Sequence, residues 1–192
     1  MARGLARDHD EKKTTLRKGA ARYFAANGFD RASMSGAARQ LGVSKALIYH
    51  YWPSKEDLLF DIFDDHFTEL LEAAQAARSK GLPGLIAAIL AAYEDADPEH
   101  KLQLDALKLL PEEKQVPLLA AQRRLVAMMS EAVAEVAPEL TPDKLRAAVM
   151  TIFGILNWVY MWHRPGKGMT RSEYASMAAD FVMGGLNRIR SE

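Results

Sequence analysis

The sequence predicts an all-α fold, and three observations support this prediction. Apolar residues recur with a period near 3.6 along most of the chain. No run shows the sustained apolar–polar alternation of a half-buried strand, and the glycines and prolines fall mostly between the periodic segments. The chain has 192 residues and a hydrophobic content of 49%, which is enough to bury a substantial core. We therefore expect a chain of nine helices.

The first two helices are expected before residue 42. A helix over about 10–27 has one apolar face, and Gly28 is placed to end it because glycine readily takes the left-handed backbone needed there. A short second helix follows Ser33, whose side chain can accept a free amide of its first turn. The apolar residues of this helix keep helical spacing until Gly42 interrupts them.

The third and fourth helices follow directly. Ser44 can cap a short helix that continues to Tyr51, and Pro53 ends it because the residue before a proline avoids helical geometry. Ser54 then opens the fourth helix, with Asp57 at its third position in an arrangement like a capping box. A long apolar stripe follows, which predicts a helix that links this first part of the chain to the rest.

Five further helices complete the expected fold. An interruption at Pro111–Pro117 is expected to precede a long helix. Thr141 with Pro142 begins a very apolar helix, and Thr170 with Glu173 forms a capping box for the last one. The five helices are expected over about 84–95, 98–109, 118–136, 142–163 and 171–190.

The two short helices within residues 33–51 have the pattern of a helix-turn-helix. A glycine turn joins them, and each is too short to be stable unless it packs on the first helix. We tested the second of them on a helical wheel with about 100° per residue. Its inward side is expected to hold Leu47, Ile48 and Tyr51. Its outward side is expected to hold Lys45, Ala46, Tyr49 and His50.

The charge of the chain is divided unequally between its two ends. Residues 1–55 contain 11 Lys and Arg against 4 Asp and Glu, a net charge of +7. Because the whole chain has a formal net charge of zero, residues 56–192 carry −7. A basic end on an acidic body suits a protein that approaches phosphates with one end only.

The outward face of the third helix predicts contacts with a DNA duplex. A cation, a phenol and an imidazole on one exposed face suit phosphates and base edges better than they suit a purely structural helix. Lys45 is the best candidate for guanine, while Ala46 and Leu47 can meet thymine methyl groups. The residues expected to contact phosphates are Ser33, Ser44, Tyr49 and Lys55, joined by His50 on the outward face and by Ser35 at a base or a phosphate.

The segment FAANGFDRASMSGAARQLGVSKALIYHYWPSKEDLL, residues 24–59, resembles the DNA-binding signature of the TetR family of bacterial regulators. The match is dense over these residues, whereas the rest of the chain matches mainly in the number and order of its helices. The resemblance implies a nine-helix, Ω-shaped homodimer whose last two helices form a four-helix interface with those of the partner. It also implies a small-molecule site among the middle helices. Trp52 stands where many members have phenylalanine.

We accordingly expect a DNA-binding domain over 1–55 and an effector-binding and dimerisation domain over 56–192. One head offers too few base contacts for specificity, so two heads are expected to read a palindromic operator. An effector that changes the spacing of the heads would then relieve repression. Small residues that permit close helix approach mark the expected interface, namely Ala147, Ala148, Gly154, Ala178, Gly184 and Gly185.

Polar groups in the apolar bundle are the clues to the effector site, because each is satisfied internally or by a guest. Asn157, inside the apolar segment 153–162, is the foremost of them. Core packing or the dimer interface is the alternative role for each candidate. The candidate ligand-binding residues are Phe63, His66, Tyr93, Gln103, Arg123, Arg124, Met128, Phe153, Asn157 and Trp158.

The class of effector is suggested by a second resemblance. The stretch from Asn157 to Pro165 is similar to TetR-family members that govern catabolism of fatty acids, steroids or aromatic acids and respond to acyl-CoA thioesters. Arg123 and Arg124 would then pair with CoA phosphates, or else simply face solvent. A regulator of efflux that responds to a lipophilic, drug-like ligand is the alternative, and an all-α adaptor protein is a further one.

Other classes of protein are not supported. The chain has no cysteine, and its five histidines lack metal-binding spacing. No catalytic motif or phosphate-binding loop is present, so we expect neither an enzyme nor a cofactor or metal. The N-terminus lacks the apolar core of a signal peptide, and the apolar stretch 147–162 is shorter than the roughly 20 residues that span a bilayer. We therefore expect that stretch to be a buried helix of a cytoplasmic protein with no membrane contact.

Overall fold

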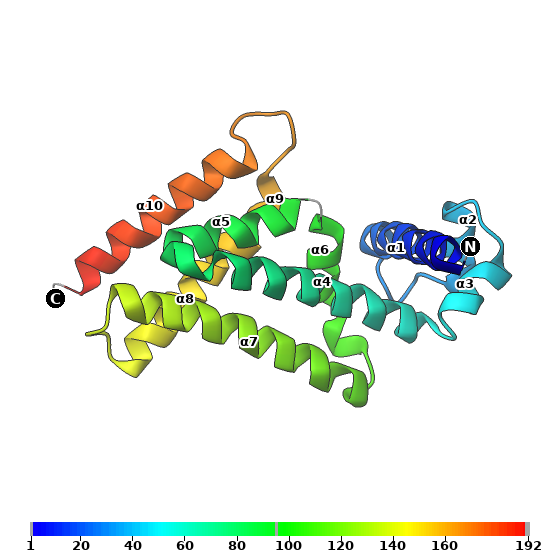
Figure 1. Cartoon of the computed structure of the whole chain (residues 1–192), viewed down its shortest axis with the longest axis horizontal. Coiled ribbons are helices and arrows are strands. Elements are labelled where there is room, and N and C mark those ends of the chain that lie inside the picture. The colour runs from blue at the N-terminus through cyan, green and yellow to red at the C-terminus, as the bar shows by residue number, and fades with distance from the viewer. Residues whose placement is uncertain (1, 95, 191–192) are drawn as a thin grey trace. The chain divides into compact units, whose positions relative to one another are not determined.

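The computed structural model describes residues 2–94 and 96–190, and every regular element within these ranges is helical (Figure 1). The all-α prediction is confirmed. The α-helices are α1 (Ala2–Asn27), α2 (Met34–Gln40), α3 (Lys45–Tyr51), α4 (Lys55–Ala77), α5 (Gly81–Glu94), α6 (Asp97–Ala106), α7 (Glu112–Val136), α8 (Pro142–Asn157), α9 (Val159–Trp162) and α10 (Arg171–Ile189). Short 3-10 turns follow α4 and α6, at Arg78–Lys80 and Leu107–Leu109.

The chain forms two compact units. The first consists of Met1–His66 with Pro98–Leu118, and the second consists of Phe67–Asp97 with Leu119–Glu192. The three crossings between the units therefore fall inside or beside helices, in α4, at the start of α6 and in α7. The domain boundary that we expected after residue 55 lies where α4 begins, and it remains a prediction.

The first unit is built on the buried face of α1. Leu16, Ala20 and Phe24 are buried on this face, and Ile48 of α3 and Leu58 of α4 are fully buried in the same unit. The predicted caps of the two short helices are both present. Ser33 Oγ accepts from the Gly36 amide at 3.0 Å, and Ser44 Oγ accepts from the Leu47 amide at 3.1 Å. The local sequence therefore sets where α2 and α3 begin.

Residues 98–118 are tied into the first unit by two lysines. Lys101 Nζ donates to the Ala25 carbonyl at the end of α1 at 2.9 Å. Lys114 Nζ donates to Asp57 Oδ1 near the start of α4 at 2.6 Å, and this bond lowers the pKa of the Asp57 carboxyl. These long-range contacts explain why a segment from the middle of the chain belongs to the same unit as the first three helices.

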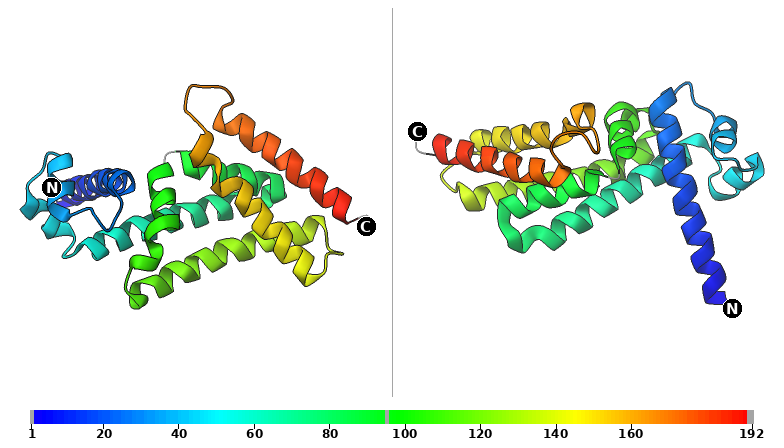
Figure 2. Two further views of the ribbon diagram at one scale, coloured as in Figure 1. Left: turned by 180° about the vertical axis from the view of Figure 1, so that it is seen from behind. Right: turned by 90° about the horizontal axis from the view of Figure 1, so that it is seen from above.

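The second unit contains the paired helices α5 and α10, which lie side by side in both Figure 1 and Figure 2. Arg171 at the start of α10 is 1% exposed, and its Nη2 donates to both carboxylate oxygens of Asp97 at 2.9 and 3.1 Å. Burial raises the pKa of Asp97, while the guanidinium opposes that effect. The predicted capping box of Thr170 and Glu173 is present in full and begins α10.

Three helix limits differ from the sequence prediction. α1 begins at Ala2 instead of near residue 10, and α5 begins at Gly81 instead of 84. α7 already begins at Glu112, so the expected interruption up to Pro117 is wrong. Pro117 lies in the second turn of α7, where it removes a single backbone donor without ending the helix.

The expected apolar helix over 142–163 is also divided. α8 ends at Asn157, Trp158 separates it from the four-residue α9, and this break accounts for the difference from the expected nine helices. Residues 142–162 are long and apolar enough to cross a membrane by length and composition. The most apolar 18-residue window within them has a mean hydropathy of 1.3, and 28% of it is buried. The expected burial therefore holds for one face of α8 only, and the other face is exposed.

The buried histidine of α4 leads to a prediction about acid stability. His66 is 2% exposed, and burial together with the nearby His100 lowers its pKa from 6.5 to about 3. Below pH 6.5 the unfolded chain therefore binds a proton that the folded chain does not bind. The free energy of unfolding decreases as the pH is lowered. We expect His66 to remove roughly 2 kcal/mol of unfolding free energy between pH 7 and 5.

Urea unfolding of the wild type and of His66→Gln at both pH values measures this contribution. The variant should lose less stability on acidification than the wild type does. Equal losses in the two proteins would show that His66 is protonated in the folded state near its ordinary pKa.

Candidate nucleic-acid interface

The third helix presents the outward face that its sequence predicts. Ile48 is fully buried, and Leu47 and Tyr51 are half-buried on the same inward side. The exposed residues of α3 and its N-cap are Ser44, Lys45, Ala46, Tyr49 and His50. A single inward anchor thus holds a helix whose remaining surface is available to a large partner.

Neighbouring contacts orient the polar groups of this face. Lys45 Nζ lies 5.4 Å from the centroid of the Tyr49 ring, a cation–π contact that leaves the ammonium exposed. The His50 ring packs edge-on against Tyr51 at 5.3 Å, and His9 of α1 lies 4.8 Å from Tyr51 between ring centroids. The face therefore offers an ammonium, a phenol and an imidazole in a restricted arrangement.

The serines predicted to contact DNA are exposed, and two of them also cap helices. Ser33 and Ser35 are exposed at the start of α2. The Oγ atoms of Ser33 and Ser44 serve as helix caps, which leaves each hydroxyl proton free to be donated to a phosphate. These serines therefore combine a structural role with the predicted one.

Lys55 has a role that the sequence did not indicate. Its Nζ donates to the carbonyls of Phe29 and Ala32 at 2.9 and 3.3 Å and lies 4.2 Å from the centroid of the Phe29 ring. This lysine ties the loop before α2 to the start of α4. Two of its three donor protons are directed to backbone oxygens, so the phosphate contact of Lys55, which stays a prediction, is left to the third.

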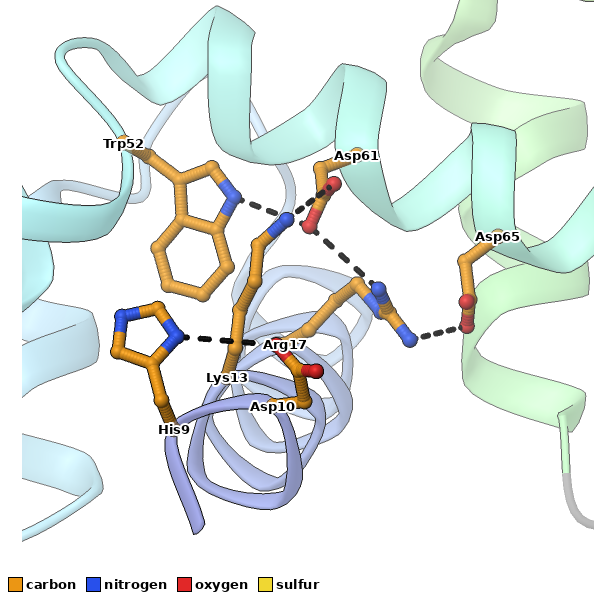
Figure 3. Close-up of polar contacts among 7 residues, drawn as sticks. All are labelled: His9, Asp10, Lys13, Arg17, Trp52, Asp61 and Asp65. Atoms are coloured by element: carbon orange, nitrogen blue, oxygen red, sulfur yellow. Dashed lines mark hydrogen bonds and ion pairs between the residues drawn. The ribbon is translucent and has the colours of Figure 1, made fainter. Parts of the chain in front are cut away.

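Two cations of α1 are also neutralised inside the first unit, as Figure 3 shows. Lys13 Nζ is 2.9 Å from Asp61 Oδ1, and Arg17 reaches Asp61 Oδ2 at 3.6 Å and Asp65 Oδ2 at 2.5 Å. Trp52 Nε1 donates to Asp61 Oδ2 at 3.0 Å. The only sequence signal for this cluster is the spacing of Asp61 and Asp65 by one helical turn, and our sequence reasoning missed it.

The positive charge open to a polyanion is therefore smaller than the net charge of the segment suggests. Lys13 and Arg17 are paired with acids of α4, and Lys55 is bound to backbone carbonyls. Within the part of the chain whose side chains are described, the basic residues before residue 55 that make no ion pair are Lys12, Lys18, Arg22, Arg31, Arg39 and Lys45. Lys45 is the one on the outward face of α3.

The candidate ligand-binding residues are divided between the two units. Phe63, His66 and Gln103 belong to the first unit, and the other candidates belong to the second. In the second unit Asn157 is satisfied internally, because Tyr93 Oη donates to its Oδ1 at 3.1 Å. Trp158 is 61% exposed, so it lies on the surface of this unit instead of lining an enclosed site.

The remaining candidates give no enclosed site either. Arg123 and Arg124 are exposed, and Arg123 Nε donates to the Leu119 carbonyl in its own helix. Phe153 is buried, and Met128 lines a small depression beside α5. Among the described residues no three His, Asp or Glu side chains gather in a way that would hold a metal ion.

An open apolar groove runs between α8 and α10 in the second unit. Phe181 on its edge is 71% exposed, and Met150 and Met177 are further exposed apolar residues on the same two helices. A Cβ added at Gly154, Gly184 or Gly185 would meet no atom within 4 Å. The groove is lined by Lys144, Ala147, Ala148, Thr151, Ile152, Ile155, Phe181, Val182, Gly185, Leu186 and Ile189.

Two protein-family models match this sequence. The model described as bacterial regulatory proteins, tetR family, matches residues 16–62. The model described as tetracyclin repressor-like, C-terminal domain, matches residues 79–186, which is more than half of the chain. The first match contains both short helices and the outward face of α3.

Individual proteins are similar over most of the chain. The HTH-type transcriptional repressor KstR2 of Mycolicibacterium smegmatis is 23% identical over 186 residues, which cover 90% of this chain and 89% of the relative. The crystal structure of a TetR-family transcriptional regulator from Bordetella parapertussis has a TM-score of 0.84 at 26% identity, over 88% of this chain and 93% of its own. AibR in complex with isovaleryl coenzyme A and operator DNA has a TM-score of 0.72 at 20% identity, over 90% of this chain and 96% of its own.

Proposed function

We propose that this chain, which belongs to the TetR family of bacterial regulatory proteins, represses transcription from a palindromic operator and is released from it by a small-molecule effector. It is a DNA-binding transcriptional regulator and not an enzyme. The exposed face of α3, with Lys45, Tyr49 and His50 around a single buried anchor, is the observation that carries the proposal. The repressor role is supported by the curated relative, which is named a transcriptional repressor.

The chemistry of the exposed face assigns a role to each side chain. The Lys45 ammonium is placed to donate to guanine O6 and N7 in the major groove, and Ala46 offers a methyl to thymine. The Tyr49 hydroxyl, the His50 imidazole and the serine hydroxyls at the two N-caps are donors to phosphates, which set the register of the helix on the duplex. Leu47 is half-buried at the edge of this face, so the thymine contact that the sequence predicts for it can involve only the exposed part of its side chain.

We propose that the groove between α8 and α10 binds the same groove of a second copy. An exposed phenylalanine and methionines beside open glycine positions form an apolar surface that a soluble monomer rarely leaves uncovered. Two copies related by a twofold axis bury such a surface against itself. The pairing also supplies two α3 helices, which a specific site needs.

We propose an acyl-CoA thioester as the effector class. AibR has been solved with isovaleryl coenzyme A and operator DNA, and KstR2 of Mycobacterium tuberculosis is named a ketosteroid transcriptional regulator, with a TM-score of 0.77 at 20% identity. Exposed Arg123 and Arg124 on one helix suit the phosphates of CoA, which guanidinium groups bind with paired donors. Effector and operator would oppose each other through a coupling of about 1–3 kcal/mol.

Selection of bound duplexes from a random pool tests the DNA proposal. We expect a palindromic consensus, and Lys45→Ala should cost about 1–3 kcal/mol at one base pair of each half-site by relaxing the preference there. Tyr49→Phe is the matched variant, and it should weaken binding to all sequences alike because it removes a phosphate contact. Equal, salt-labile binding to every polyanion would instead favour an adaptor protein.

Sedimentation measures the assembly. Phe181→Glu places a charge on the apolar groove and should raise the dissociation constant of the dimer more than about tenfold. Val116→Glu places the same charge on another exposed apolar residue, which lies on α7 and is 56% exposed, and it should leave the dimer intact. A monomeric wild type, or equal effects of both substitutions, would contradict this interface.

Thermal shift with isovaleryl-CoA, longer acyl-CoAs and free CoA tests the effector class. We expect at least one thioester to raise the melting temperature and to weaken operator binding by about 5–150-fold. Arg123→Ala combined with Arg124→Ala should reduce that shift, because the phosphates lose their cations. Stabilisation by lipophilic drug-like compounds and by no thioester would support the efflux alternative.

A further inference from the structure

Three elements of the first unit meet at one carboxylate. Asp61 of α4 accepts from Lys13 Nζ of α1 at 2.9 Å and from Trp52 Nε1 at 3.0 Å, while Arg17 Nη1 lies 3.6 Å away (Figure 3). Trp52 is the residue directly after α3, and it is 3% exposed. The same acid thus contacts α1, α4 and the end of the helix that faces DNA.

We propose that Asp61 is a positioning residue for operator recognition, which holds the end of α3 through Trp52 and keeps Lys13 away from DNA. The inference rests on the proposed function, since it concerns the same α3 surface. It predicts that Asp61 sets the ratio between specific and non-specific DNA binding, beyond any contribution to folding.

α3 is a short helix that depends on contacts at both of its ends. With seven residues, α3 is too short to hold its own geometry, and its two ends are fixed by separate contacts. Ser44 caps its beginning, and the Trp52 amide donates to the Ile48 carbonyl at its end. The indole bond to Asp61 joins this end to α4, a bond that a phenylalanine at position 52 cannot make.

Asp61 also neutralises a lysine that lies close to the end of α3. His9 packs against Tyr51 at 4.8 Å between ring centroids, so this part of α1 lies beside the end of α3. Lys13 is one helical turn further along α1, and its side chain is 33% exposed despite the ion pair. Without a carboxylate at position 61, the ammonium of Lys13 is free to attract phosphates of any sequence.

Arg17 stays paired when the charge of Asp61 is removed, unlike Lys13. Its Nη2 is paired with Asp65 at 2.5 Å, and its side chain is only 12% exposed. Asp61→Asn therefore breaks the ion pair of Lys13 and leaves one amide oxygen in place of two carboxylate oxygens, so that the lysine and the indole compete for a single acceptor. Non-specific binding should become stronger because Lys13 can reach phosphates, and specific binding should become weaker because the end of α3 is held less firmly.

The experiment compares Asp61→Asn with Asp64→Asn. Asp64 is exposed on the same helix and belongs to no ion pair or hydrogen bond of this cluster, so the control has the same change of net charge. Affinities for the selected operator and for a random duplex are measured over a range of salt concentrations. Melting temperatures of both variants are recorded alongside.

For Asp61→Asn we expect operator affinity to fall about tenfold and random-duplex affinity to stay equal or rise, with a salt slope steeper by about 0.9 for each head that gains a phosphate contact. Asp64→Asn should leave the ratio of the two affinities unchanged. Equal losses for both duplexes with an unchanged slope would reduce Asp61 to a support of the fold, and equal behaviour of the two variants would reduce the effect to net charge. Either result overturns the proposal.

Trp52→Phe provides a second, uncharged variant. It keeps an aromatic ring at the end of α3 but removes the indole donor and part of the buried ring, with no change of charge, so operator affinity should fall while the salt slope stays as in the wild type. Unchanged operator affinity in this variant would contradict the positioning role even if Asp61→Asn does not fold. A wild type without sequence-specific binding would instead refute the proposed function itself.

Discussion

The fold of the DNA-facing end depends on the packing of the inward side of one seven-residue helix. α3 buries Ile48 completely and Leu47 and Tyr51 in part, which is little apolar surface for a separate element. The caps, the Trp52 indole and the adjoining α1 helix supply the remaining constraints. These contacts all lie on the inward side and at the two ends of α3. The side chains of the outward side are therefore not needed for folding and can serve binding.

Charge in this unit is organised by pairing as much as by composition. The segment before residue 56 carries +7, yet Lys13 and Arg17 lie on acids of α4 and Lys55 lies on backbone carbonyls. The unpaired cations therefore decide which surface attracts phosphates. A high net charge favours binding to any duplex, whereas a few cations at defined positions favour one register. Internal neutralisation of the others is thus consistent with a protein that must distinguish sequences.

The sequence predicted the features that depend on neighbouring residues. The serine caps of α2 and α3, the threonine caps of α8 and α10, and the inward and outward sides of α3 all depend on spacing within one or two turns. The role of Lys55 and the Trp52–Asp61 bond depend on residues brought together by packing, which no spacing rule contains. The ligand-binding residues stay a prediction for the same reason, since polar residues on apolar helices mark burial without telling which other residues lie opposite.

The misjudged length and burial of α8 show a limit of another kind. Hydropathy shows that a helix is apolar, but it does not show whether protein core, lipid or a second subunit covers the helix. A core helix, a membrane span and a helix shared between two subunits have the same signal over 142–162. In this chain Val149, Ile152 and Leu156 bury one side, while Met150, Thr151 and Gly154 leave the other side exposed. This exposed apolar side is the physical basis of the proposed pairing with a second copy, because a charge-poor face with open glycine positions allows another helix to approach closely.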